Sequence, residues 1–145
     1  MPQRPISSII ERQSVLTAPL ATTVADAARL MKEGHVAALL VIDEAKRIAG
    51  IFTERDALFR VIAEGRSPKT TRIADVMTAH PQTIDADRPF AQALVMMHEG
   101  GYRHLPVVKN GRPVGMVSAR DALGLDWKDL ESELERRQQI GESLG

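Results

Sequence analysis

The 145-residue chain contains no cysteine. This excludes disulfide bonds, catalysis by a thiol and zinc sites built on thiolates. The chain also has only five aromatic residues, one Trp, one Tyr and three Phe, so aliphatic side chains and methionine must fill its core. Apolar residues nevertheless make up 43% of the sequence, which is enough for a folded core and argues against extensive disorder.

Neither sign of charge is in excess, because 19 Lys and Arg residues balance 19 Asp and Glu residues. This balance argues against a mainly electrostatic role on DNA, RNA or an anionic membrane. The first residues, MPQRPISSIIERQ, hold no apolar signal-peptide core, and no apolar run approaches the length of a transmembrane helix. We therefore expect a soluble cytoplasmic protein with no nucleic-acid or membrane partner.

One phrase occurs twice in the chain, as GIFTERDAL at 50–58 and GMVSARDAL at 115–123. Sliding the chain along itself extends the match, with Met31 matching Met97 at an offset of 66 that becomes 65 after one gap. Such self-similarity is the signature of a duplicated structural unit. The sequence therefore predicts two related halves.

The join between the halves is the polar segment EGRSPKTTR at 64–72, whose Gly and Pro are typical of a linker. The predicted division of the chain is a first unit with an N-terminal helix over 1–66, a second unit over 67–124, and a helical tail over 125–145.

Each half is predicted to run helix, strand, strand, helix. Apolar spacing in the first half predicts a helix over 22–34 with Gly34 as its C-cap, followed by a strand over 36–42 that is buried on both faces. In the second half, Asn110-Gly111 predicts a tight hairpin. One small sheet with helices on one face cannot bury both faces, so the halves must pack together. The predicted fold is α/β (α+β) with two pseudo-symmetric halves.

The tail DWKDLESELERRQQI is predicted to be helical, with Asp126 as N-cap. Trp127, Leu130 and Leu134 fall on one face of this helix. That face fits packing on the tail's own domain as well as it fits a dimer contact, and both interpretations stay open.

The repeated pattern of a hydroxyl residue and an Asp three positions later fits two roles. Thr53 to Asp56 and Ser118 to Asp121 each follow a strand and open a helix, which is a capping-box signature. The same turn also suits a ligand, because open α/β structures bind ligands where strands end, and an ionised carboxylate accepts hydrogen bonds from vicinal hydroxyls such as those of a ribose. The pattern alone favours capping and leaves the ligand role open.

Basic residues stand near both turns. Arg103 and His104 come just before a buried strand, where they suit phosphate oxygens. Arg55 and Arg120 each directly precede the repeated Asp. The alternative for all four is an ordinary solvated side chain.

The phrases VADAARLM…GHVAALLVID…RIAGIFTERD and IADVMTAHPQTIDADRPFAQALVMM…YRHLPVVKNGRPVGMVSARD resemble a pair of cystathionine β-synthase (CBS) domains, the Bateman module. The resemblance covers residues 9–123. It implies a non-catalytic module without a required cofactor, which binds adenosine-containing ligands in two clefts between its halves. AMP, ADP or ATP is the expected ligand, with S-adenosylmethionine or NAD as the alternative. The resemblance further implies a homodimer that regulates an unknown partner protein.

By position, the resemblance assigns the ribose hydroxyls to Asp56 in one cleft and Asp121 in the other. Each cleft is expected to borrow residues from the opposite half. The expected ligand-binding residues are Thr53, Asp56, Thr83, Arg103, His104 and Arg120 for the first cleft, and Thr22, Ala37, Ala38, Arg55, Ser118 and Asp121 for the second. Because Ala37 and Ala38 replace the Arg-His pair of the second half, the Asp56 cleft is expected to bind phosphorylated nucleotides more tightly.

Other functional classes are weaker. The sequence shows no Ser-His-Asp order, metal-ligand cluster or P-loop, and its four His residues are scattered, so we expect no enzyme activity and no metal site. A nucleic-acid binder is disfavoured by the neutral charge and few aromatics. An assembly module with empty clefts stays open as an alternative.

Overall fold

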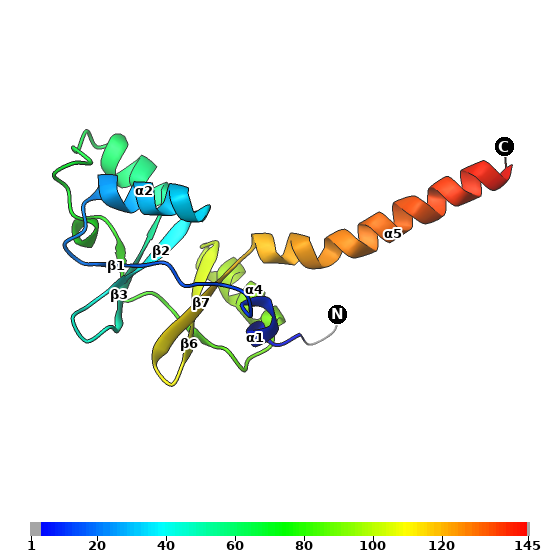
Figure 1. Cartoon of the computed structure of the whole chain (residues 1–145), viewed down its shortest axis with the longest axis horizontal. Coiled ribbons are helices and arrows are strands. Elements are labelled where there is room, and N and C mark those ends of the chain that lie inside the picture. The colour runs from blue at the N-terminus through cyan, green and yellow to red at the C-terminus, as the bar shows by residue number, and fades with distance from the viewer. Residues whose placement is uncertain (1–3, 145) are drawn as a thin grey trace.

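The structure is a computed structural model that describes the backbone of residues 4–144 and, within that range, the side chains outside 125–130 and 139–144. Two small sheets lie side by side, and a long C-terminal helix extends away from them (Figure 1). This arrangement confirms the predicted α+β fold. The elements in chain order are α1 (Ile6–Ile9), β1 (Thr17–Pro19), α2 (Val24–Gly34), β2 (Ala38–Ile42), β3 (Ile48–Thr53), α3 (Glu54–Asp56), η1 (Ala57–Ile62), η2 (Ile73–Asp75), β4 (Thr78–Ala79), β5 (Ile84–Asp85), α4 (Phe90–Gly100), β6 (His104–Lys109), β7 (Arg112–Ser118) and α5 (Arg120–Leu144).

Both halves are built on the same antiparallel hairpin. The first sheet has the order β1-β2-β3-β4, with β1 parallel to β2 and the other neighbours antiparallel. The second has the order β5-β6-β7, with β5 parallel to β6 and β6 antiparallel to β7. Ala38 lies opposite Thr53 in one hairpin, and His104 lies opposite Ser118 in the other. These are the positions that the sequence repeat matches, so the repeat is confirmed in the strand register.

The turn between β6 and β7 confirms the predicted tight hairpin. Asn110 and Gly111 have φ values of 54° and 76°, and Lys109 pairs with Arg112 directly across the turn. Positive φ at both central residues gives a turn whose twist matches that of the flanking strands, which is why Asn-Gly suits it.

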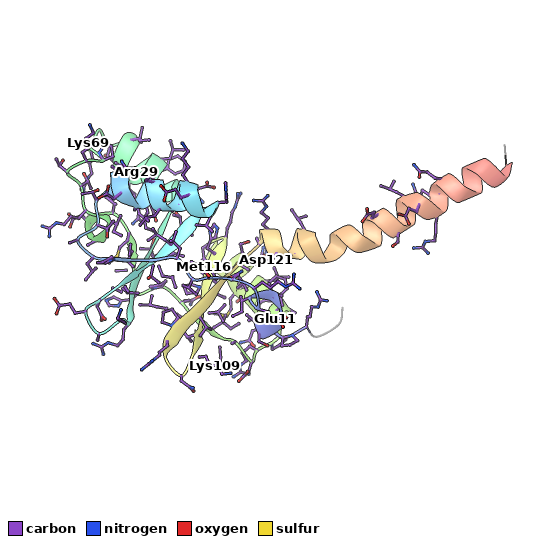
Figure 2. All side chains as sticks on the ribbon, viewed as in Figure 1. Glu11, Arg29, Lys69, Lys109, Met116 and Asp121 are labelled. Atoms are coloured by element: carbon purple, nitrogen blue, oxygen red, sulfur yellow. The ribbon has the colours of Figure 1, made fainter. Side chains whose placement is uncertain are left out.

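Strand β2 is buried on both faces, as the continuous apolar run predicted. Leu39 and Val41 pack in the core of the first half. Leu40 faces the other way and joins Ile51 in a small cluster against which Met116 of the second half packs. Met116 accordingly lies where the two halves meet (Figure 2). The halves therefore bury the second face of their sheets against each other.

The segments that precede each half are exchanged between the halves. Ile6 and Ile10, at and just after the N-terminal helix α1, belong to the core of the second half, and α1 lies beside α4 (Figure 1). The connection between the halves extends past the predicted segment 64–72, and residues 64–82 are called the linker from here on. Its residues Ile73 and Val76 belong to the core of the first half. The division of the sequence at residue 66 stays a prediction, but the N-terminal helix assigned to the first unit packs on the second.

Gly50 and Gly115, at equivalent positions in the two halves, leave room for the exchanged segments. A Cβ added at Gly50 would lie 2.9 Å from the carbonyl oxygen of Thr78, beside the Met77 side chain. A Cβ at Gly115 would lie 2.8 Å from Ile10 Cγ2. The glycine of the repeated phrase is therefore needed because the crossing segment approaches the strand closely.

Helix α2 ends at Gly34, as the predicted range 22–34 requires, but its C-cap is the following residue. Gly34 is its last helical residue, and His35 is the C-cap, with the left-handed angles φ 53° and ψ 41°. The matching C-cap of α4 is Gly101, with φ 72°. The prediction that Gly34 is the C-cap is therefore wrong, because the geometry of the helix end places the left-handed residue at His35.

Replacing His35 with glycine should raise the free energy of unfolding by about 0.5–1 kcal/mol. A residue with a Cβ is disfavoured in the left-handed region, although glycine also gains freedom in the unfolded chain. Urea unfolding of wild type and His35→Gly measures the change. Gly101→His is the matched control and should lose a similar amount; equal stability of all three proteins would contradict the argument.

The helix predicted to begin at Thr53 is present but divided. Its first turn is α3, and the six residues of η1 that follow form a π-helix. The capping signature at Thr53 predicts where the helix begins, whereas no pattern in the sequence predicted the wider turns of η1.

The C-terminal helix begins earlier than predicted. α5 starts at Arg120, separated from the end of β7 by one residue, so Asp126 lies inside it and the prediction that Asp126 is the N-cap is wrong. The helix runs for 25 residues and projects away from both sheets (Figure 1), and Leu134 is 63% exposed. The side chains of 131–138 are exposed, whereas those of Trp127 and Leu130, which share the predicted face with Leu134, lie outside the described residues. Packing of that face on its own domain and contact with a second copy both stay predictions.

Candidate functional site

The turn from β3 into α3 forms a complete capping box. The Asp56 N–H donates to Thr53 Oγ1 at 3.2 Å, and the Thr53 N–H donates to Asp56 Oδ2 at 3.0 Å. These bonds satisfy two backbone donors at the helix start. The structural role of the repeated pattern is therefore confirmed in the first half, where Asp56 is only 8% exposed.

The second half repeats this turn closely. The Ser118 N–H donates to Asp121 Oδ2 at 2.8 Å. The Ala119 N–H donates to the Arg103 carbonyl at 3.0 Å, as the Glu54 N–H donates to the Ala37 carbonyl at 2.9 Å in the first half. Asp121 stands at the start of α5 (Figure 2). The two turns therefore share the bond from the hydroxyl residue's N–H to the Asp carboxylate and the backbone bond to the residue that directly precedes the other strand of the hairpin.

Asp56 also faces an arginine that the sequence reasoning missed. Its Oδ1 lies 3.6 Å from Arg60 Nε, while Arg60 Nη1 donates to the carbonyls of Val76 and Met77 at 3.2 and 2.9 Å. The spacing of four residues between Asp56 and Arg60 was a signal that this pair shares one helical face.

A cleft of about 1020 Å³ opens at Asp56 and lies between the halves. Its volume is of the size that small-molecule sites have. Thr78 and residues 80–82 form one wall of the cleft, and residues 101–104, which lead into β6, form another. The lining residues are Ile51, Thr53, Glu54, Arg55, Asp56, Leu58, Phe59, Arg60, Thr78, His80, Pro81, Gln82, Gly101, Tyr102, Arg103 and His104.

The cleft brings together most of the residues expected for the Asp56 site. Thr53, Asp56, Arg103 and His104 all line it. Of the described residues, neither Thr83, which directly precedes β5, nor Arg120, exposed at the start of α5, is among its lining. Their roles as ligand contacts stay predictions.

Arg55 is placed differently from the expectation. The resemblance assigns it to the Asp121 cleft, but it lines the Asp56 cleft, with its guanidinium carbon 5.5 Å from the centre of the Phe59 ring. This distance allows a cation–π contact. Arg55 therefore adds a cation to the Asp56 cleft.

The remaining residues expected around Asp121 have backbone roles in the structure. The Thr22 carbonyl accepts a hydrogen bond from the Ile73 N–H at 2.8 Å, and Ala37 and Ala38 hold the start of β2 against the β3–α3 turn. These contacts place Thr22, Ala37 and Ala38 close to the exchanged linker and the first hairpin. Their role as ligand contacts stays a prediction.

Tyr102 and Gln82 close part of the cleft together. The Tyr102 hydroxyl donates to Gln82 Oε1, and burial raises the pKa of the tyrosine. Both residues were missed because their positions before β6 and after β4 become neighbours only in the folded chain.

His104 is half-buried between the two halves. Burial lowers its pKa below the ordinary 6.5, and Arg103 acts in the same direction, whereas the carboxylates of Glu54 and Asp121 oppose this shift. The neutral imidazole is therefore the favoured form at neutral pH.

Stability should fall as the pH drops through the His104 titration. Because the folded pKa is below the unfolded one, the unfolded chain binds more protons, so stability is lost as pH falls from about 6.5 toward the folded pKa. Urea unfolding at pH 7, 6 and 5 should show a shallower loss in His104→Gln than in wild type. His98→Gln, at an exposed helix end, serves as the control; identical pH profiles of His104→Gln and wild type would contradict the assignment.

No group of three or more potential metal ligands occurs among the residues that the structure describes. Over the same residues, none of the helices has the length and apolar character needed to cross a membrane.

Two matched halves around a shared cleft define a tandem-repeat module, and comparison with known proteins identifies its class. The CBS domain model matches residues 6–63 and 73–127, so the chain belongs to the CBS domain family. This confirms the resemblance drawn from the sequence.

Several curated relatives are described as CBS domain-containing proteins. The Arabidopsis thaliana CBS domain-containing protein CBSCBSPB3 is 38% identical over 129 residues, which are 89% of this chain and 22% of the relative. The mitochondrial CBSX3 of the same plant is 36% identical over 118 residues, 79% of this chain and 57% of the relative. The chain thus spans between about a fifth and about three fifths of the length of these relatives.

Solved structures share the fold. A protein with CBS domains from Burkholderia ambifaria is 31% identical, with a TM-score of 0.77 over 83% of this chain and 93% of that one. The protein PAE2072 from Pyrobaculum aerophilum, complexed with AMP, has a TM-score of 0.74 at 24% identity over 81% and 88% of the two chains. The CBS domain pair of MJ0100, in complex with 5-methylthioadenosine and S-adenosyl-L-methionine, has a TM-score of 0.78 at 23% identity over 88% and 99%.

Proposed function

We propose that this chain is a non-catalytic cytoplasmic module that binds adenine nucleotides and regulates a partner protein. The observation that carries the proposal is the cleft between the halves, in which the buried carboxylate of Asp56 lies near cations from both sides. AMP, ADP or ATP is the proposed ligand.

Asp56 retains the capacity to hold a ribose. Its Oδ2 accepts one hydrogen bond from the Thr53 N–H, and each carboxylate oxygen can accept two. Vicinal hydroxyls donate to such a group, and the bond is stronger because the acceptor is charged. Asp56 therefore serves both the capping box and the ligand in this proposal.

The charge of the cleft favours a phosphorylated ligand. Arg60 faces Asp56 and binds two backbone carbonyls, which leaves Arg55 and Arg103 against the carboxylate of Glu54. Phosphate groups gain from this excess of guanidinium groups, whereas the sulfonium and ammonium of S-adenosylmethionine do not. The AMP complex of PAE2072 and the methylthioadenosine complex of MJ0100 support an adenosine-containing ligand in a protein of this fold.

Thermal unfolding with AMP, ADP, ATP, NAD or S-adenosylmethionine tests the proposal. A ligand that binds only the folded protein stabilises it by about 2.7 kcal/mol at a hundred times its dissociation constant. AMP, ADP or ATP should give the largest increase in melting temperature, and native mass spectrometry should show the nucleotide bound. No shift with any of the five compounds would favour the assembly module with empty clefts. Turnover of ATP by the purified chain would contradict a non-catalytic module.

We further propose that the module is a homodimer. Leu58, Phe59 and Ile62 are 50%, 54% and 67% exposed on one short helical stretch, and Val95 of α4 is 53% exposed. Exposed apolar side chains that cluster on one element are typical of an interface. Leu58 and Phe59 also line the Asp56 cleft, so the two proposed roles share this stretch. Light scattering at micromolar concentration should give twice the chain mass with or without nucleotide, and a monomer mass would contradict it.

Control of a partner requires that the ligand favour one of two arrangements. The proposed moving element is α5, because Asp121 stands in its first turn. Nucleotide binding should change hydrogen exchange in α5, and unchanged exchange with every bound nucleotide would contradict this part of the proposal.

A further inference from the structure

Arg60 connects the cleft to the segment that links the two halves. Its Nη1 donates to the carbonyls of Val76 and Met77, while its Nε lies 3.6 Å from the Asp56 carboxylate. A guanidinium holds its donors in a fixed plane, so one side chain can bind two carbonyls and face a carboxylate at once. One arginine thus bridges the candidate ribose carboxylate and the linker backbone.

The backbone that Arg60 holds continues directly into the wall of the cleft. After Met77, β4 pairs with β3, and the His80 N–H donates to the Ala49 carbonyl at 3.1 Å. His80, Pro81 and Gln82 then line the cleft. The two carbonyls that Arg60 binds thus directly precede the strand that leads into this wall segment.

The second half has no counterpart of this arginine. At the repeat offset of 65, the residue that matches Arg60 is Leu125. There the crossing segment is held by Gln13, whose side-chain amide exchanges two hydrogen bonds of 3.0 Å with the backbone of Met116. The link from a cleft carboxylate to a crossing segment through arginine is therefore a feature of the Asp56 cleft.

We propose that Arg60 is a positioning residue, which acts from Asp56 through Val76 and Met77 to hold the wall segment His80–Gln82 in place. A wall held in advance does not have to be ordered when a ligand binds, so Arg60 increases affinity without contacting the ligand. This last step rests on the proposed function; the link between Arg60 and the wall does not.

Hydrogen exchange of the full chain without nucleotide tests the link. Arg60 is 52% exposed, so Arg60→Met should fold. The His80 amide should then exchange about tenfold faster, because local opening becomes easier. Arg60→Lys should give an intermediate rate, since an ammonium can still bind a carbonyl and face Asp56. Arg47→Met is the matched control, because Arg47 also faces an Asp four residues away, Asp43 at 3.4 Å. Equal His80 exchange in Arg60→Met and Arg47→Met would overturn the proposal.

Calorimetric titration with AMP and with adenosine separates positioning from direct contact. If Arg60 acts through the wall, Arg60→Met should weaken both ligands by the same factor, about three- to tenfold. Loss of AMP affinity with adenosine unchanged would mean that Arg60 contacts the phosphate, and would overturn the positioning role. If His80 exchanges faster in Arg60→Met but the wild-type protein binds neither AMP nor adenosine, the link between Arg60 and the wall is upheld and the proposed function is refuted.

Discussion

Asp56→Ala is expected to weaken AMP binding at least about a hundredfold. In the proposed complex two ribose hydroxyls donate to this carboxylate, and a hydrogen bond to a charged group contributes about 1.5–3 kcal/mol when well desolvated. Asp56 is 8% exposed, so water screens it little. Even the lower value for two bonds exceeds the roughly 2.7 kcal/mol that a hundredfold change in affinity represents. Isothermal titration of AMP into both proteins measures the effect.

The capping box must be separated from the ligand in this experiment. Asp56→Ala also removes the bond from the Thr53 N–H, and a lost cap costs about 1 kcal/mol of stability. Asp56→Asn keeps the shape of the side chain and one oxygen that can accept from the Thr53 N–H, but it loses the charge. Its stability should therefore be closer to that of wild type, whereas its affinity for AMP should be reduced as in Asp56→Ala. Circular dichroism at the titration temperature confirms that each variant is folded.

Asp121→Ala is the matched control in the second repeat. It removes the equivalent bond from the Ser118 N–H. The Asp121 cleft is expected to be lined by Ala37 and Ala38, at the positions where Arg103 and His104 line the Asp56 cleft. Asp121→Ala should therefore spare the tight binding event for AMP, ADP and ATP. Loss of that event in Asp121→Ala, with Asp56→Ala unaffected, would show that the cations are assigned to the wrong cleft.

Gly50→Ala should lower the free energy of unfolding by roughly 2–3 kcal/mol, as overpacked sites typically do. The new Cβ would lie 2.9 Å from the Thr78 carbonyl oxygen, a backbone atom of strand β4 that cannot rotate away. The linker would have to move off β3, and Val76 and Met77 with it. Urea unfolding monitored by circular dichroism measures the loss as a lower midpoint.

Two other glycines provide the comparison for Gly50. Nothing lies within 4 Å of a Cβ at Gly124, inside α5, so Gly124→Ala should be neutral or stabilise by up to about 1 kcal/mol. Gly115→Ala meets the Ile10 side chain rather than backbone, and should cost less than Gly50→Ala. A Gly50→Ala protein within 0.5 kcal/mol of wild type by this measurement would contradict the steric argument.

Local chemistry explains why much of the fold was predictable. The hairpin at Asn110-Gly111 depends on residues that accept positive φ, and the capping box at Thr53 depends on groups three residues apart. Both are properties of short segments, so the sequence alone predicts them. The duplication likewise appears in the matched phrases, and the strand register repeats it.

The candidate site was predictable only in part, for the same reason. Thr53 and Asp56 are adjacent on one turn, and the adjacent pair Arg103-His104 stood out by charge. The sequence identifies Arg55 as a candidate cation but does not assign it to the correct cleft. The placement of its guanidinium depends on the Phe59 ring, which η1 positions. Gln82 and Tyr102 carry no signal of their own, since they become neighbours through the pairing of β4 and the packing of the second half.

The sequence by itself determined the repeat, the two central hairpins with the helices beside them, and the turns that carry Asp56 and Asp121, because the hairpins and turns depend on contacts within a few residues. The short strands β1 and β4 were not part of that prediction. Tertiary structure alone decided that the N-terminal helix packs on the second half and the linker on the first, since Ile6 and Ile73 are the same residue type and no local pattern assigns them to different cores. It also decided that Arg60 reaches Val76 and Met77, sixteen and seventeen residues away. Such long-range contacts depend on how distant segments pack together, which no local sequence pattern predicts.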